Sequence, residues 1–208
     1  MQAININNHE LKNILGNFLP ALLNVPRTTF PYHQGNTLKL TPEYATGIEY
    51  LTHMQSKKVD GFPEQTVGVD LMRFTTPFDS VQKALKLLDR ELIDWSGSRN
   101  NAVKMLYPKG GFMGWHHNAN AAGYNILLSW SEKGLGFFRY QDPITKEVVT
   151  MQDTPGWTCK VGYYGRWSEP EKIYWHCASA EHEERFTLGY IIPHEGLWQD
   201  MIDDIQSS

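Results

Sequence analysis

Hydrophobic residues recur at intervals of three and four in the first hundred residues, which is the spacing of one face of an α-helix. This spacing predicts helices over three segments: 9–25, 41–54 and 77–95. Pro20 is expected to kink or stop the first helix. Thr41 as N-cap and Pro42 at the first helical position mark the start of the second. The third has its apolar residues on one face: Val81, Leu85, Leu88 and Leu92.

Short apolar runs indicate β-strands, one early and the rest after Asn100. The early strand is predicted over residues 66–74. The later strands are predicted over seven segments: 102–107, 124–130, 135–140, 147–152, 157–164, 172–179 and 184–192. Turn-forming residues separate several of them: Ser131–Gly134, Gln141–Lys146 and Asp153–Gly156. This spacing is typical of an antiparallel jelly roll or barrel.

The arrangement of these elements predicts one α+β domain over residues 1–208. A chain of 208 residues fits a single domain with a sizeable core. The mainly helical residues 1–99 are expected to buttress the sheet of residues 100–193, and a closing helix is predicted within residues 194–208.

Composition narrows the class of protein. The formal net charge is −4, and the basic residues are scattered, which argues against nucleic acid as a substrate. No apolar run has transmembrane length, and the first residues lack the features of a signal peptide. Without an export signal, Cys159 and Cys177 are expected to be free thiols in a cytoplasmic protein.

Two segments carry candidate metal ligands. In an extended segment His116 and Asn118 share one face, and His117 points to the other. His176 lies within a predicted strand between large apolar residues. Two imidazoles that converge from different strands make a metal site plausible, and nitrogen and oxygen ligands with open positions favour Fe(II) over a closed zinc site.

Residues 103–193 resemble the double-stranded β-helix (a jelly roll) of the Fe(II)/2-oxoglutarate-dependent dioxygenases. The resemblance is to the prolyl-hydroxylase-like branch and to short oxygenases of that type from phages. Tyr107, Gly110 and His116 match a recurring pattern of that branch at its spacing. The segment 175–192 resembles the part of the family that carries the distal histidine, the basic residue and the closing strand.

The resemblance implies a role for each matching residue. His116, Asn118 and His176 would occupy the metal positions. Arg185 and Thr187 would bind the distal carboxylate of 2-oxoglutarate, and Tyr107 would contact the co-substrate. The implied reaction consumes O2, hydroxylates a C–H bond of a peptide, amino acid or small molecule, and releases succinate and CO2.

Asn118 departs from the family pattern, which has an aspartate there. An amide leaves the metal more positively charged and is a weaker donor. Asn120 or His117 could supply the third ligand instead, or the protein could be a non-catalytic or repurposed binding protein. A cupin-like metal enzyme without 2-oxoglutarate is a third alternative, against which Arg185 followed by Thr187 argues.

Candidate substrate residues lie in segments that usually line or rim such a pocket: Trp115, Asn120, Asn125, Trp130, Arg139 and Trp157. For the aromatic residues, core packing is the alternative explanation. Arg139 could bind an acidic group of the substrate or pair with Glu147. The charged segment 181–184 is expected to be a solvated loop.

Overall fold

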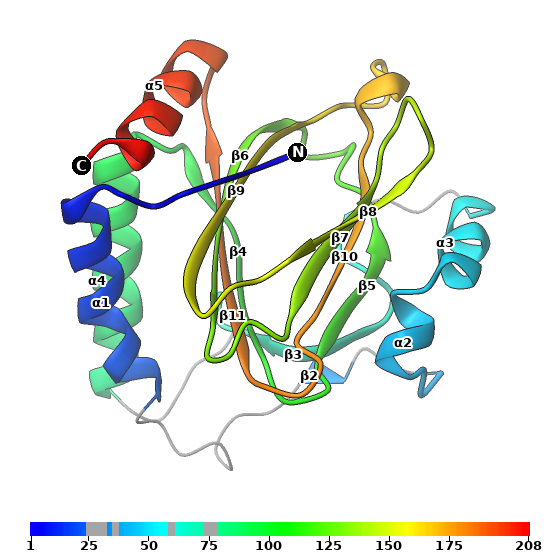
Figure 1. Cartoon of the computed structure of the whole chain (residues 1–208), viewed down its shortest axis with the longest axis horizontal. Helices are drawn as coiled ribbons and strands as arrows, with labels where there is room; N and C mark the ends of the chain where they lie inside the picture. Colours follow the sequence, from blue (N-terminus) through cyan, green and yellow to red (C-terminus); the bar gives the residue numbers. More distant parts are fainter. Residues whose placement is uncertain (24–32, 35–37, 58–60, 73–78) are drawn as a thin grey trace.

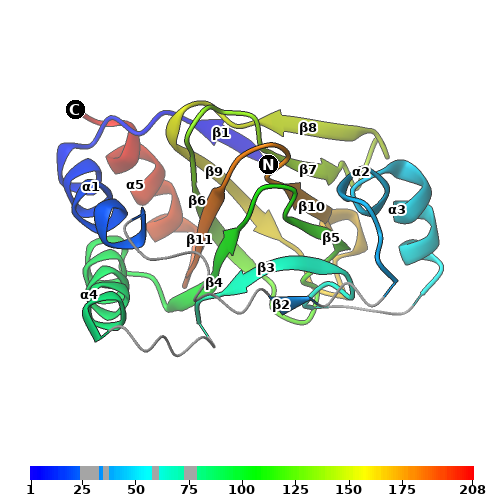
Figure 2. The same ribbon diagram turned by 90° about the horizontal axis from the view of Figure 1, so that it is seen from below.

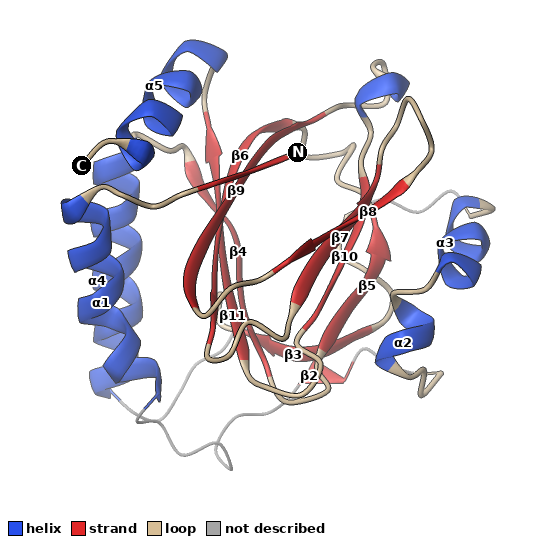
Figure 3. Cartoon of the chain, in the orientation of Figure 1, coloured by secondary structure: helices blue, strands red, loops and turns tan. Residues whose placement is uncertain are grey.

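Antiparallel strands dominate the architecture (Figure 3). The computed structural model describes residues 1–23, 33–34, 38–57, 61–72 and 79–208. Within these residues eleven strands are hydrogen-bonded into one strongly bent sheet, and every strand pair is antiparallel.

The sheet folds over into two facing layers, a jelly-roll-like β-sandwich. One layer contains, in spatial order, β1 (Gln2–Ile4), β9 (Gly156–Tyr164), β6 (Gly123–Ser131), β11 (Arg185–Ile192) and β4 (Asn100–Tyr107). The other contains β5 (Phe112–His116), β10 (Trp175–Ser179), β7 (Phe137–Gln141) and β8 (Val148–Gln152). Strand β3 (Thr66–Asp70) pairs with both β4 and β5 and joins the layers, and β2 (His33–Gln34) pairs with β3.

Helices cover the outside of this sandwich, which makes the fold α+β (Figures 1 and 2). Three lie on the outer face of the first layer: α1 (His9–Leu23), α4 (Asp79–Ser96) and α5 (Glu195–Gln206). Two short helices lie beside β5: α2 (Pro42–Ala45) and α3 (Ile48–Gln55). A turn of 3₁₀-helix, η2 (Pro170–Lys172), precedes β10.

The predicted apolar helix faces are confirmed as the contact with the sheet. Val81, Leu85, Leu88 and Leu92 of α4 are buried in the same core as the apolar residues of α1. Helix α1 continues past Pro20 to Leu23, so the proline does not stop it. Parts of three predicted elements lie outside the described residues: 24–25, 73–74 and 77–78.

The predicted helix over 41–54 is instead two helices. Thr41 caps α2 as expected, with its Oγ1 accepting a hydrogen bond from the Tyr44 amide at 3.3 Å. The chain then turns at Gly47, which is extended and precedes α3. A Cβ at Gly47 would lie 2.9 Å from the Glu43 carbonyl oxygen, so only glycine allows the two helices to approach so closely.

The strand boundaries after Asn100 largely follow the prediction. Strand β5 is an addition, in a glycine-containing segment without strict alternation. Strand β10 begins at Trp175 rather than Lys172, because Pro170 starts the 3₁₀ turn. The closing helix is confirmed as α5, with His194 as its N-cap. Cys159 and Cys177 are buried and free, as expected. None of the described helices is both long and apolar enough to cross a membrane.

Candidate functional site

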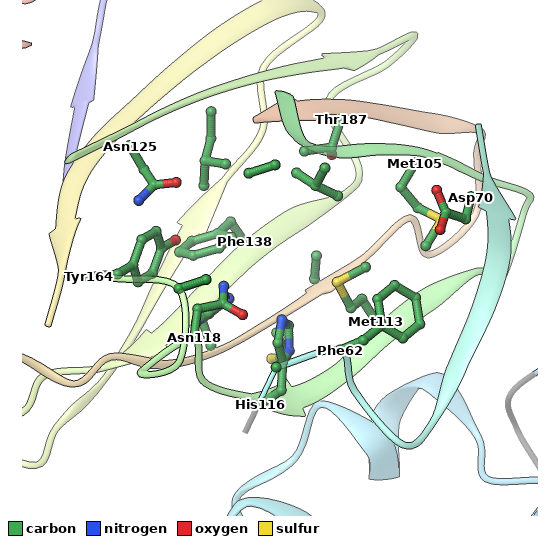
Figure 4. Close-up of a pocket in the computed structure, with 18 of the residues that line it drawn as sticks. Phe62, Asp70, Met105, Met113, His116, Asn118, Asn125, Phe138, Tyr164 and Thr187 are labelled. Atoms are coloured by element: carbon green, nitrogen blue, oxygen red, sulfur yellow. The ribbon is translucent and has the colours of Figure 1, made fainter. Parts of the chain in front are cut away.

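A cavity of about 430 Å³ opens between the two layers of the sandwich. This volume lies within the range of ligand-binding pockets. Most of its wall is apolar, with Met105, Met113 and Phe138 among the lining residues (Figure 4). Phe62 and Met72 also line it and are 44% and 50% exposed, so they lie at its open side.

Two imidazoles lie side by side in the wall of this cavity. His116 ends β5 and His176 lies in the neighbouring strand β10, directly opposite it in the register. Their ring centroids are 4.2 Å apart and both side chains are 6% exposed. Two imidazoles that bind one metal ion in adjacent positions, with bonds of about 2.1 Å, have centroids roughly 4.5 to 5 Å apart, only slightly more than the distance here. The spacing therefore suits a shared metal ion.

The backbone fixes which nitrogen of each ring is available. His116 Nδ1 is 2.9 Å from the Gly114 carbonyl oxygen, and His176 Nδ1 is 2.9 Å from that of Tyr174. A carbonyl can only accept, so each Nδ1 carries the hydrogen and each Nε2 retains a lone pair. Burial lowers the pKa of His116 to about 4, and burial with the neighbouring His116 lowers the pKa of His176. Both rings are therefore neutral at pH 7, as metal binding requires.

Asn118 stands at the third position. It follows β5 in the loop to β6 and faces the cavity beside His116 (Figure 4). Its Nδ2 lies 3.4 Å from His176 Nε2. A turn of the carboxamide by 180° would present the oxygen instead. With an amide at this position, two of the three expected metal positions hold a histidine, and no group of three His, Cys, Asp or Glu side chains suited to a metal ion occurs in the described part of the chain.

The other end of the cavity carries a positive charge. Arg185, at the start of β11, lines the cavity and is 1% exposed. Its Nη1 donates to Thr187 Oγ1 at 2.5 Å, and its Nη2 donates to Ser129 Oγ at 3.0 Å. Tyr107 of β4 lies alongside, with its ring centroid 5.7 Å from the guanidinium carbon. These groups form a donor-rich end opposite the two imidazoles.

Two charged residues behind Arg185 are not indicated by the sequence pattern. Arg185 Nε donates to Asp153 Oδ2 at 2.6 Å, and Lys160 Nζ donates to Asp153 Oδ1 at 2.7 Å. Burial alone would raise the pKa of Asp153, but Arg185 and Lys160 outweigh this and hold it below its usual value. Asp153 belongs to a predicted turn and Lys160 to a predicted strand, and only the β-sandwich brings them together.

The structure brings most of the predicted site residues to this one cavity. Those that line it are Tyr107, His116, Asn118, Asn120, Asn125, His176, Arg185 and Thr187. Three tryptophans lie elsewhere and pack in the protein interior. Trp115 is fully buried beside α3 and donates to the Gly47 carbonyl oxygen, while Trp130 and Trp157 pack in the core beneath α1.

Arg139 and the segment 181–184 depart from the prediction, whereas His117 follows it. Arg139 also lies away from the cavity and donates to the Thr46 carbonyl oxygen and the Thr150 hydroxyl, rather than pairing with Glu147. His117 points away from His116, as the alternation predicts, and does not line the cavity as the alternative third ligand would. It lies edge-on to the rings of Trp167 and Trp175. The segment 181–184 is not uniformly solvated, because Glu183 is 5% exposed.

Comparison with known proteins gives distant structural likenesses, two of which are a prolyl-4-hydroxylase and a ribosomal oxygenase. No family model and no curated protein matches the sequence. A prolyl-4-hydroxylase from Pseudomonas putida is similar with a TM-score of 0.32 and 14% identity, over 62% of this chain and 71% of that chain. YcfD, a ribosomal oxygenase from Escherichia coli, has a TM-score of 0.35 and 16% identity, over 72% of this chain and 36% of that chain.

Both likenesses are too distant to assign a function. The function must therefore follow from the side chains of the cavity. The two Nε2 atoms and the Asn118 amide form a neutral nitrogen and oxygen donor set, which fits a divalent transition metal with open positions. Arg185 with its hydroxyl partners fits a carboxylate.

Proposed function

We propose that this protein is an Fe(II)- and 2-oxoglutarate-dependent oxygenase with a double-stranded β-helix core. The observation that carries the proposal is the composition of one cavity. It presents two imidazole Nε2 atoms at one place and a buried arginine with two hydroxyl groups at another. A bifunctional ligand with a metal-binding end and a carboxylate end matches this arrangement.

Each residue then has a stated task. His116 and His176 would hold the metal through Nε2, with Asn118 as a third, uncharged donor. Arg185 Nη1 and the hydroxyls of Thr187 and Ser129 would bind the distal carboxylate of 2-oxoglutarate. Once bound, iron and 2-oxoglutarate supply activation of O2 with release of succinate and CO2. The apolar walls would exclude water from the reacting centre.

The substrate would enter at the open side of the cavity. Phe62 and Met72 offer exposed apolar surface there, and Asp70 is the carboxylate among the described lining residues. A peptide, an amino acid or another small molecule with an accessible C–H bond fits this opening. Hydroxylation is the reaction that the proposed metal and co-substrate support.

Asn118 favours one alternative function, that of a binding protein without turnover. Its Nδ2 already lies 3.4 Å from His176 Nε2, so the imidazole has a partner in the absence of metal. An amide also leaves the positive charge of Fe(II) uncompensated by the protein. In this alternative the cavity would bind a carboxylate ligand, and no O2 would be consumed.

One experiment separates the two functions. Anaerobic addition of Fe(II) and then 2-oxoglutarate should produce a metal-to-ligand charge-transfer band in the visible spectrum, absent when 2-oxoglutarate is omitted. Admission of O2 should then yield succinate even without substrate. Absence of both the band and succinate would contradict the oxygenase, whereas calorimetric binding of 2-oxoglutarate without either signal would favour the binding protein.

A further inference from the structure

Arg185 is the first member of a buried chain of alternating charges. Its Nε and Nη2 contact the two oxygens of Asp153 at 2.6 and 3.4 Å. On the far side Asp153 accepts from Lys160 Nζ at 2.7 Å. The side chains of all three residues are at most 2% exposed. Charges buried to this extent are weakly screened by solvent, so each one affects the others strongly.

The three charged residues lead away from the cavity, with Arg185 at its wall and Asp153 and Lys160 behind it. Arg185, Thr187 and Ser129 line the cavity, whereas Asp153 and Lys160 do not. Asp153 thus binds the rear edge of the guanidinium and leaves Nη1 directed toward Thr187 and the cavity. Asp153 orients Arg185, but its negative charge also weakens the attraction of Arg185 for an anionic ligand.

Lys160 offsets that negative charge. Together Arg185, Asp153 and Lys160 have two positive charges and one negative charge. A second carboxylate, Glu183, lies at the same end of the sheet. Its oxygens are bound by the Ser131 hydroxyl and by the amides of Lys133, Leu135 and Gly136. Glu183 is therefore held by the β6–β7 turn, and Lys160 is the residue that compensates Asp153.

We propose that Lys160 is a specificity-determining residue: by neutralising Asp153 it allows Arg185 to select a 2-oxo acid that has a second, distal carboxylate. The inference rests on the proposed function, whose co-substrate it concerns. Lys160 acts through Asp153 and Arg185 and does not touch the ligand. Its removal should therefore weaken only ligands that have the distal charge.

The test compares two acids of equal chain length by isothermal titration calorimetry, with Mn(II) as a redox-inert metal. 2-Oxoglutarate has the distal carboxylate and 2-oxopentanoate lacks it. Lys160→Met should weaken 2-oxoglutarate roughly tenfold and leave 2-oxopentanoate within about twofold. Lys160→Arg, which retains the charge, should bind 2-oxoglutarate within about threefold of the unmodified protein.

A charge-rescue variant distinguishes electrostatics from damage to the fold. In the double variant Lys160→Met with Asp153→Asn, neither position 153 nor position 160 has a charge, so the charge of Arg185 is again not cancelled. The affinity for 2-oxoglutarate should therefore return most of the way to that of the unmodified protein. The matched control is Lys104→Met, which removes another buried lysine paired with an aspartate, Asp89, outside the cavity lining. That control should change neither affinity.

Each outcome decides between the hypotheses. Equal weakening of both acids by Lys160→Met, no change in either, or weaker 2-oxoglutarate binding by the double variant than by Lys160→Met would overturn the role of Lys160. In those cases binding of 2-oxoglutarate by the unmodified protein leaves the proposed co-substrate intact. If the unmodified protein binds neither acid, the proposed function and this inference are both wrong.

Discussion

The side chain at position 118 determines how much negative charge the protein offers to a metal ion. With Asn118 the donors are two neutral imidazoles and an amide. Asn118→Asp places a carboxylate next to the same two Nε2 atoms, and a carboxylate is the stronger ligand for Fe(II). We expect this variant to bind Fe(II) or Mn(II) at least tenfold more tightly, measured anaerobically by competition with a chromophoric chelator.

Asn120→Asp is the matched control, because Asn120 lies in the same loop and also lines the cavity. It adds the same charge two residues further along. If position 118 faces the metal, the gain at 118 should clearly exceed the gain at 120. An equal gain would mean that the metal responds only to the general potential of the cavity, and a larger gain at 120 would move the third ligand there.

The sequence indicates residues of this site only where chemistry and local geometry coincide. His116 and Asn118 could be assigned to one face because a strand alternates, and the cavity lies on that face. Asp153 and Lys160 could not be found in this way. Nothing local relates them to Arg185, 32 residues from Asp153 along the chain, until the strands pair. Large aromatic residues are also poor indicators of a substrate pocket, since the candidates Trp130 and Trp157 pack in the core instead.

At the scale of elements, Glu183 fixes the turn between β6 and β7. Its carboxylate accepts hydrogen bonds from the Lys133 amide at 2.6 Å and the Leu135 amide at 2.5 Å, and from the Ser131 hydroxyl. These bonds connect the turn to the segment just before β11, whose first residue is Arg185. Glu183 therefore keeps two elements of the site together.

This contact should make stability depend on pH. Burial would raise the pKa of Glu183, but its hydrogen-bond donors outweigh burial and hold the pKa below its usual 4.5. A carboxyl group whose pKa is lowered by folding stabilises the protein at pH values above its unfolded-state pKa. That stabilisation is lost as the pH falls through the folded-state pKa. Glu183→Gln should lower the free energy of unfolding by about 1 to 3 kcal/mol at pH 7, and by less below pH 4.

Urea unfolding at several pH values measures this difference. Glu181→Gln is the control, because Glu181 is exposed and two residues away. It should change stability little at any pH. A loss in Glu183→Gln that stays constant from pH 7 to pH 3 would contradict the electrostatic explanation and would indicate only altered packing.

Element boundaries could be predicted where one residue decides them locally. Thr41 and Pro42 begin a helix as expected, because capping is a property of adjacent residues. The break at Gly47 is not predicted, since the apolar spacing continues through it, and the close approach of Gly47 to the Glu43 carbonyl oxygen is visible only in the folded backbone. Strand β1 has three residues, too few to show a period, and is held by pairing with β9.

At the scale of the whole molecule, the helical layer supports the sheet without contributing to the site's chemistry. Adjacent residues of α4 allow a matched comparison. Leu88 is 2% exposed in the core, and Leu87 is 45% exposed. Leu88→Ala should lower the free energy of unfolding by about 2 to 5 kcal/mol, through lost apolar contacts and a residual cavity. Leu87→Ala should change it by less than about 0.5 kcal/mol.

Thermal or urea unfolding, together with metal affinity measured on the folded fraction, tests whether the helical layer affects stability without affecting metal binding. Both leucine variants should bind Mn(II) as the unmodified protein does. Weaker metal binding by Leu88→Ala under conditions where it is fully folded would show that the helical layer also tunes the geometry of the two imidazoles.

Metal binding should in turn stabilise the whole molecule, because the two imidazoles converge only in the folded chain. His116 and His176 are 60 residues apart in sequence and meet through the pairing of β5 with β10. A metal that binds the folded state alone adds about 2.7 kcal/mol at a free concentration 100 times its Kd. For a chain of this size that corresponds to a rise in Tm of roughly 5 to 10 °C. Mn(II) should raise the Tm of the unmodified protein, and excess chelator should reverse the rise.

Two histidine variants assign that rise to the cavity. His176→Ala removes one Nε2 donor and should abolish the shift. His117→Ala removes the adjacent imidazole, which lies against Trp167 and Trp175 on the other face of the segment. It should lower the starting Tm, because two aromatic contacts are lost, yet retain the full metal-induced rise. Retention of the full rise in His176→Ala would place the metal outside the cavity, and the pairing of His116 with His176 would then be purely structural.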